Sequence, residues 1–191
     1  ATKAEHEYML IRRGHEREQR DNDENRVLDF TSDVSNATVE EAMKTLARWR
    51  RESHDPIVLR FSSPGGSVIS GLGLFDYIQS IRREGIRVTT CTLGFAASMA
   101  CILLQAGDER VMGENAHILI HEVASGAIGK LSEMEDETKF ARRINDRLVG
   151  ILSARSKMGR TAIKNRAKRK DWWLDSDEAI RLGFCDRLGY A

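Results

Sequence analysis

The chain has 191 residues, 41% of them hydrophobic, and a formal net charge of +1 at pH 7. This length is enough for one folded domain with a substantial core and short for two. The balanced charge gives no electrostatic argument for a nucleic-acid partner. No apolar run approaches the length that spans a membrane, and the first residues lack the pattern of a signal peptide.

The three cysteines, Cys91, Cys101 and Cys185, are scattered and lie in apolar surroundings. Such residues are usually small buried hydrophobic side chains in a reducing compartment. We therefore expect free thiols and a cytoplasmic protein. No group of histidines and cysteines has the spacing of a metal site, so no metal is expected.

Charged residues dominate positions 1–25, where only the run YMLI at 8–11 is apolar. This composition predicts a flexible, charged N-terminal arm that has little core of its own and becomes ordered only against a neighbour. The folded part should be a single domain over residues 26–191.

Hydrophobic periodicity and turn residues predict strands alternating with helices, which is typical of an α/β fold. In chain order we expect a strand at 27–30, a helix at 38–52, a strand at 57–61, a helix at 68–83, a strand at 86–93, a turn at 94–97, a helix at 98–105, strands at 110–112 and 117–121, a helix at 131–158, a basic segment at 160–170, a strand at 172–174 and a helix at 176–182. Thr38 with Glu41, and Asp175 with Glu178, have the spacing of helix N-terminal caps. The helix at 131–158 is about 28 residues long, which exceeds the usual helix of a small domain, so part of it should project and meet another subunit.

Two motifs could bind a developing negative charge, and each also has a purely structural interpretation. Gly65 and Gly66 follow a strand, and a residue without Cβ lets a backbone N–H approach a carbonyl oxygen, as an oxyanion hole requires. A Pro-Gly-Gly sequence is nevertheless most often only a tight turn. Ser98 follows a turn of small residues and opens a buried helix, where free N–H groups, such as that of Met99, favour an anion. Taken alone, Ser98 is more simply a helix N-cap.

His121 ends an apolar strand and is therefore placed where it could face a cleft. His117 lies on the same face of that strand, because side chains alternate, so periodicity does not choose between the two histidines. Asp171 lies between a basic run and a pair of tryptophans. It is either a solvated ion or a residue that orients a catalytic histidine.

Together these motifs resemble the ClpP-type serine peptidases. The segments that carry the resemblance follow the family's order and approximate spacing, and they read SPGGSV, GFAASMA, LIHE and KDWWLDSDEAIRLGFCD. The resemblance extends from about Arg26 to Leu188. It implies a ClpP/crotonase-like fold of stacked β/α units with a projecting long helix, and a catalytic triad of Ser98, His121 and Asp171.

By the same resemblance, the N–H groups of Gly66 and Met99 form an oxyanion hole, and an extended peptide binds beside Gly65, Ser67 and Val68. The implied activity is endopeptidase hydrolysis of peptides or unfolded proteins, without a metal or organic cofactor. The implied assembly is a chambered homo-oligomer of heptameric rings that stack in pairs as a tetradecamer. No nucleic acid or membrane is expected among the partners.

The sequence also departs from the family's pattern. Glu122 and Val123 stand where typical members have Gln-Pro, and the family's N-terminal axial loop is not recognisable. Members that work with a hexameric AAA+ unfoldase present aromatic residues where this chain has Val58, Arg60 and Ser80. An arginine in an apolar docking pocket carries a heavy desolvation cost, which argues against a standard unfoldase partner.

Three other functions remain open at this point. A specialised processing protease would act on a dedicated capsid or precursor substrate without an unfoldase, and the departures favour it. A non-catalytic ring subunit or scaffold would usually lack part of the triad. A crotonase-like acyl-CoA enzyme shares the fold, but the resemblance to such enzymes does not extend to a serine in this turn.

Overall fold

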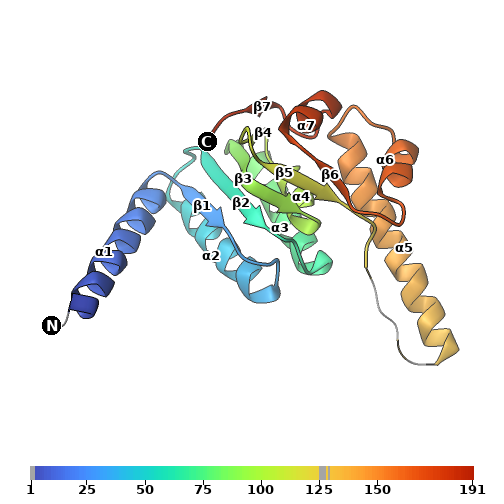
Figure 1. Cartoon of the computed structure of the whole chain (residues 1–191), viewed down its shortest axis with the longest axis horizontal. Helices are drawn as coiled ribbons and strands as arrows, with labels where there is room; N and C mark the ends of the chain where they lie inside the picture. Colours follow the sequence, from blue (N-terminus) through green and yellow to red (C-terminus); the bar gives the residue numbers. More distant parts are fainter. Residues whose placement is uncertain (1–2, 125–127, 129) are drawn as a thin grey trace.

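A sheet of mainly parallel strands forms the centre of the molecule, with helices packed against it (Figure 1). The structure is a computed structural model that describes residues 3–124, 128 and 130–191. Its helices are α1 (Lys3–Glu24), α2 (Asn36–Glu52), α3 (Val68–Arg83), α4 (Met99–Leu104), α5 (Leu131–Ala154), α6 (Arg160–Ala167) and α7 (Ser176–Leu182). Its strands are β1 (Val27–Phe30), β2 (Ile57–Ser63), β3 (Val88–Ala97), β4 (Glu109–Met112), β5 (His117–Ile120), β6 (Trp172–Leu174) and β7 (Arg187–Leu188). The predicted α/β class is confirmed.

The strand β3 connects two parts of the sheet. The main path runs β1-β2-β3-β4-β7, with every neighbouring pair parallel. Residues 89–92 of β3 pair with β4, whereas residues 95–97 pair with β5. β5 in turn pairs with β6 in antiparallel register. The prediction of a turn at 94–97 was wrong. These residues stay in β3 because they pair with β5, which lies about 20 residues later in the sequence and cannot be identified as a partner from the local sequence.

The core lies between the sheet and the helices, with residues from every helix of the described chain except α1. In α2 the buried residues recur at helical spacing and are Val39, Ala42, Leu46 and Trp49. All six residues of α4 are buried, so this helix lies inside the core. In β2, buried residues alternate with half-buried ones, which is typical of a strand with one well-covered face.

The charged N-terminal segment forms the helix α1, for which no regular structure was predicted. The helix is exposed along almost its whole length, including the apolar residues Tyr8, Met9, Leu10 and Ile11. At its C-terminal end Asp23 accepts a hydrogen bond from the Trp49 indole (2.9 Å) and pairs with Arg48. Figure 1 shows α1 extending away from the sheet. Among the described residues, no helix is both long and apolar enough to cross a membrane.

The helix boundaries show which local predictions held. α3 has the predicted bounds, Asp175 caps α7 by accepting the N–H of Glu178 (2.8 Å), and Gly183 ends α7 in the left-handed conformation. The predicted cap at Thr38 was wrong: Ser35 is the N-cap of α2, and Thr38 bonds back to it.

The C-terminal part of the chain differs from the prediction at three places. α5 ends at Ala154 instead of near residue 158, and the basic segment contains the helix α6. The short strand β7 was also not predicted, because two residues carry no periodic pattern.

Arg110 holds this C-terminal part to the sheet. Its buried guanidinium donates hydrogen bonds to the carboxylate of Asp186 (2.6 and 3.0 Å) and to the carbonyl oxygens of Gly183 and Phe184 (2.9 and 3.1 Å). Burial raises the pKa of the Asp186 carboxyl, but the hydrogen bonds from Arg110 outweigh this effect, and the pKa lies below its ordinary value.

We predict that Asp186→Asn lowers the free energy of unfolding at pH 7 by about 1–2 kcal/mol. This is less than a fully buried charged hydrogen bond contributes, because solvent screens the partly exposed carboxylate. A carboxyl with a lowered folded-state pKa contributes its full stability above the unfolded-state pKa, about 3.9 for aspartate, and loses it as the pH falls through the lower folded-state value. Urea titrations should therefore show that the free energies of unfolding of the variant and the wild type differ less at pH 3 than at pH 7. Asp76→Asn, an exposed position on α3, is the control. Equal differences at both pH values would contradict the account.

Candidate functional site

Ser98 occupies a strained turn between β3 and α4. Its φ of 55° and ψ of −121° lie outside the regions that residues with a Cβ usually adopt. Its N–H donates to the carbonyl oxygen of Leu119 (2.9 Å), and its carbonyl oxygen accepts from Cys101 (3.1 Å). The hydroxyl forms no side-chain cap with α4. Capping therefore does not explain the serine, although it stands at the N-cap position.

The glycine loop after β2 packs directly against this turn. A Cβ at Gly65, whose φ is +87°, would lie 2.6 Å from the Ala97 carbonyl oxygen, 2.7 Å from Cβ of Ser98 and 2.8 Å from the Met99 nitrogen. A Cβ at Gly66 (φ +144°) would lie 2.4 Å from the Val34 carbonyl oxygen. Both positions therefore require glycine, and the two predicted motifs form one structural unit.

Two backbone N–H groups of this unit have no acceptor among the described residues. The chain around Gly66 is held by neighbouring groups, because Val34 donates to the Gly65 carbonyl (2.8 Å) and receives the N–H of Ser67 (2.6 Å). The N–H groups of Gly66 and Met99 themselves donate to no residue in the described part of the chain. Met99 is the first residue of α4, so its N–H has no partner within the helix.

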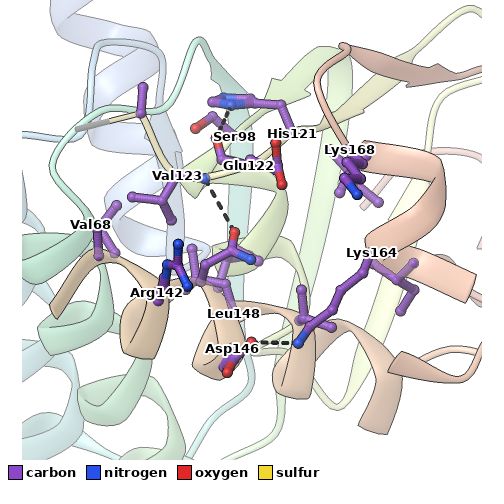
Figure 2. A pocket seen from close by; sticks show the side chains of 18 of the residues that line it. Val68, Ser98, His121, Glu122, Val123, Arg142, Asp146, Leu148, Lys164 and Lys168 are labelled. Atoms are coloured by element: carbon purple, nitrogen blue, oxygen red, sulfur yellow. Dashed lines mark hydrogen bonds and ion pairs between the residues drawn. The ribbon is translucent and has the colours of Figure 1, made fainter. Parts of the chain in front are cut away.

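His121 follows the last residue of β5 and lines the same cavity as Ser98, which has a volume of about 940 Å³ (Figure 2). Its Nδ1 lies 2.6 Å from the carbonyl oxygen of Glu122. A carbonyl only accepts hydrogen bonds, so in the neutral imidazole this contact favours the tautomer with the proton on Nδ1, which leaves Nε2 as an acceptor. His117 is exposed at the start of β5 and does not line this cavity.

Asp171 and His121 lie just beyond the same end of the paired strands β6 and β5, and no hydrogen bond joins them. β5 and β6 are antiparallel, and the last pair at this end is Ile120 opposite Trp172. His121 directly follows Ile120 and Asp171 directly precedes Trp172, so the two residues flank the same end of the strand pair. Asp171 is exposed and does not line the cavity, and no hydrogen bond joins its carboxylate to a described residue.

The other residues named from the sequence are divided between the cavity and its support. Gly66 and Val68 line the cavity, whereas Gly65, Ser67 and Met99 do not. The Ser67 hydroxyl caps α3 by accepting the N–H of Ser70 (3.3 Å). No group of metal-ligating side chains suited to an ion occurs among the described residues.

The helices α5 and α6 form the far wall of the cavity with polar residues that the sequence did not identify. Asn145 accepts the N–H of Val123 (3.2 Å), and Asp146 pairs with Lys164 (2.6 Å). The Lys164 ammonium, through its hydrogen bond, holds the pKa of the Asp146 carboxyl below its ordinary value. Figure 2 shows both contacts as dashed lines. In the sequence, Asn145 and Asp146 appear only as two polar residues of a helix. Their position at the cavity becomes clear only once the fold is known.

The thiol of Cys101 is a second possible nucleophile at the same cavity. Cys101 lines it, but burial raises the pKa of this thiol far above its ordinary value. The nucleophilic thiolate is therefore negligible near neutral pH. All three cysteines are buried and free, as expected.

We predict that Gly65→Ala lowers the free energy of unfolding by about 1–3 kcal/mol from backbone strain alone, with a further loss from the contacts its Cβ would make with the serine turn. Gly73→Ala is the matched control, because nothing lies within 4 Å of a Cβ in that helical position, and it should be neutral or stabilising by up to about 1 kcal/mol. Urea unfolding followed by circular dichroism measures both. A Gly65→Ala protein as stable as wild type would show that the loop and the serine turn are not in close contact.

The chain matches a known protein family over most of its length. The model of the Clp protease family matches residues 18–190, from within α1 to the end of the domain. The parallel sheet with its helices agrees with the ClpP-like fold, and family members are serine-type peptidases. Because the match covers nearly the whole length, the chain belongs to the Clp protease family.

Proposed function

We propose that this protein is a serine endopeptidase in which Ser98 is the nucleophile, His121 the general base and Asp171 the residue that orients the base. The observation that carries the proposal is the backbone of Ser98, strained at φ 55° beside a cavity that His121 also lines. Such strain persists only where the surrounding structure enforces it, and it concentrates at functional positions. A serine on a sharp strand-to-helix turn is also how other hydrolases expose a nucleophile.

In the proposed reaction, Oγ of Ser98 attacks the peptide carbonyl carbon while Nε2 of His121 takes the hydroxyl proton. The N–H groups of Gly66 and Met99 stabilise the oxyanion. The C–N bond then breaks, His121 gives its proton to the leaving amine, and an ester remains on Ser98. A water molecule deprotonated by His121 hydrolyses that ester, which releases the acid and restores the serine.

Asp171 is proposed to stabilise the imidazolium that forms during each half-reaction. Its place next to the last pair of β5 and β6, at the end where His121 follows β5, supports this role. In the structure Nδ1 of His121 instead lies 2.6 Å from the Glu122 carbonyl oxygen. The carboxylate of Asp171 would replace that carbonyl when the substrate is bound.

We propose peptides or unfolded chains as substrates, bound in extended form along Gly65–Val68. An extended segment can lie beside this loop and bind it through main-chain hydrogen bonds. The free thiols of the three cysteines are compatible with the reducing cytoplasm in which we place the protein.

Assembly into a chambered oligomer of heptameric rings, stacked as a tetradecamer, is part of the proposal. It is supported by apolar side chains that the single chain leaves exposed on the projecting half of α5, namely Leu131, Met134 and Phe140. Exposed apolar groups concentrated on one projecting element favour burial against another subunit. The C-terminal half of α5 instead packs on its own core through Val149 and Leu152.

A processing protease that acts without an unfoldase is the second candidate, and the surroundings of Arg60 favour it. Phe61 is buried in the core, whereas Arg60 is half-buried on the opposite face of β2. The Arg60 guanidinium donates to the Ala191 carbonyl oxygen (2.7 Å) and lies 3.7 Å from the Asp29 carboxylate. A partner's apolar loop would have to desolvate this charged group. A non-catalytic scaffold, by contrast, would not require a strained serine.

We predict that His121→Gln abolishes hydrolysis of a fluorogenic peptide, as Ser98→Ala does, with a loss of several orders of magnitude. His117→Gln should retain most of the activity, because His117 is exposed and outside the cavity. The two variants carry the same substitution, one at the first residue of β5 and one directly after its last residue. The opposite pattern of activity would assign the base to His117 and remove the basis for the proposed triad.

We further predict peptide cleavage without ATP-dependent degradation of a folded substrate. The measurement mixes this protein with a standard AAA+ unfoldase, ATP and a folded, tagged substrate, and follows a short peptide in parallel. Loss of each aromatic docking anchor costs about 1–4 kcal/mol, and the losses repeat around a ring. Efficient degradation of the folded substrate would contradict the docking argument and leave the peptidase assignment intact.

A further inference from the structure

Glu122 links the two chain segments that carry His121 and Asp171. Its carboxylate oxygen Oε2 accepts the backbone N–H of Arg169 at 3.0 Å, although the two residues are 47 positions apart. Glu122 directly follows the histidine, and Arg169 lies two residues before the aspartate. This hydrogen bond is therefore placed where it can set the distance between the two side chains.

The segment that Glu122 contacts has an unfavourable backbone conformation. Arg169 has a φ of 57°, which is uncommon for a residue with a long side chain. It lies in the turn after α6, where the Lys170 N–H reaches the Ala167 carbonyl only at 3.4 Å. Such a conformation needs support from its surroundings, and the bond from Glu122 supplies it.

Charge pairing does not explain this contact. Lys168, Arg169 and Lys170 form a basic turn, yet the Glu122 carboxylate makes no ion pair with any described side chain and bonds the backbone instead. A bond to the backbone fixes the path of the chain, whereas an exposed ion pair contributes little.

The main chain at Glu122 also contacts neighbouring residues. The next residue, Val123, donates its N–H to the side-chain oxygen of Asn145 on α5 (3.2 Å). The Glu122 carbonyl oxygen lies 2.6 Å from Nδ1 of His121. Glu122 thus contacts the histidine through its main chain and the Asp171 segment through its side chain.

We propose that Glu122 is a positioning residue for the reaction: it holds the turn at Arg169 so that Asp171 stays near His121. The inference rests on the proposed triad and deepens it. It implies that the Glu122 side chain acts through Asp171 and does not itself take part in proton transfer.

The test compares three substitutions of Glu122 by steady-state hydrolysis of a peptide. Glu122→Ala removes the acceptor, and Glu122→Asp keeps the charge but is too short to reach, so both should lower kcat by about 10- to 100-fold, as expected for a misplaced catalytic group, with KM within a factor of about two. Glu122→Gln retains a side-chain carbonyl that can accept the same N–H and should keep most of the activity. Glu114→Ala, an exposed carboxylate in the β4–β5 loop, is the control and should behave as wild type.

A double-mutant cycle with Asp171→Ala separates positioning from general damage. Glu122→Ala should have no further effect on kcat once Asp171 is removed, and circular dichroism should show each variant folded. Additive losses, or a Glu122→Asp protein with wild-type kcat, would overturn the proposal. An inactive wild-type protein would instead overturn the proposed function, so the two failures are distinguishable.

Discussion

The site depends on the close approach of two chain turns at the ends of β2 and β3. Gly65 lies so near the Ser98 turn that a single Cβ would come within 3 Å of three of its atoms. The parallel pairing of the two strands brings these ends together, and it shifts register between Phe61 and Ser63 just before the loop. The glycine loop, which has no Cβ atoms at Gly65 and Gly66, packs against the strained backbone of Ser98, and each stabilises the position of the other. The contact also brings the chain at Gly65 close to the Met99 nitrogen, since a Cβ at Gly65 would lie 2.8 Å from it.

The sequence predicted those parts of the fold that local chemistry determines. Asp175 and Gly183 cap α7 through their own side-chain and backbone preferences, and the hydrophobic period of α3 gave its bounds. The prediction failed where a distant partner decides. Residues 94–97 contain small residues typical of a turn, but pairing with β5 makes them part of β3. Thr38 resembles a cap, but the chain enters α2 one turn earlier, at Ser35.

The same distinction applies to the site. Ser98, His121 and the glycine loop follow from motifs, and the structure places Ser98, His121 and Gly66 at one cavity. Asp171 could be named only by family resemblance, and its relation to His121 comes from the register of β5 and β6. The hydrogen bonds of Glu122 to Arg169 and of Asn145 to Val123 were not predicted, because each joins residues that are far apart in the sequence.

The central claim is that Ser98 is the nucleophile of a peptidase, and covalent labelling tests it most directly. The native protein would be treated with a fluorophosphonate, which reacts with an activated serine, and the adduct would be located by intact-mass and peptide-mapping mass spectrometry. The account predicts a single adduct on Ser98 and none in the Ser98→Ala protein. A folded, correctly assembled protein that stays unlabelled at Ser98, or is labelled at another serine, would contradict it.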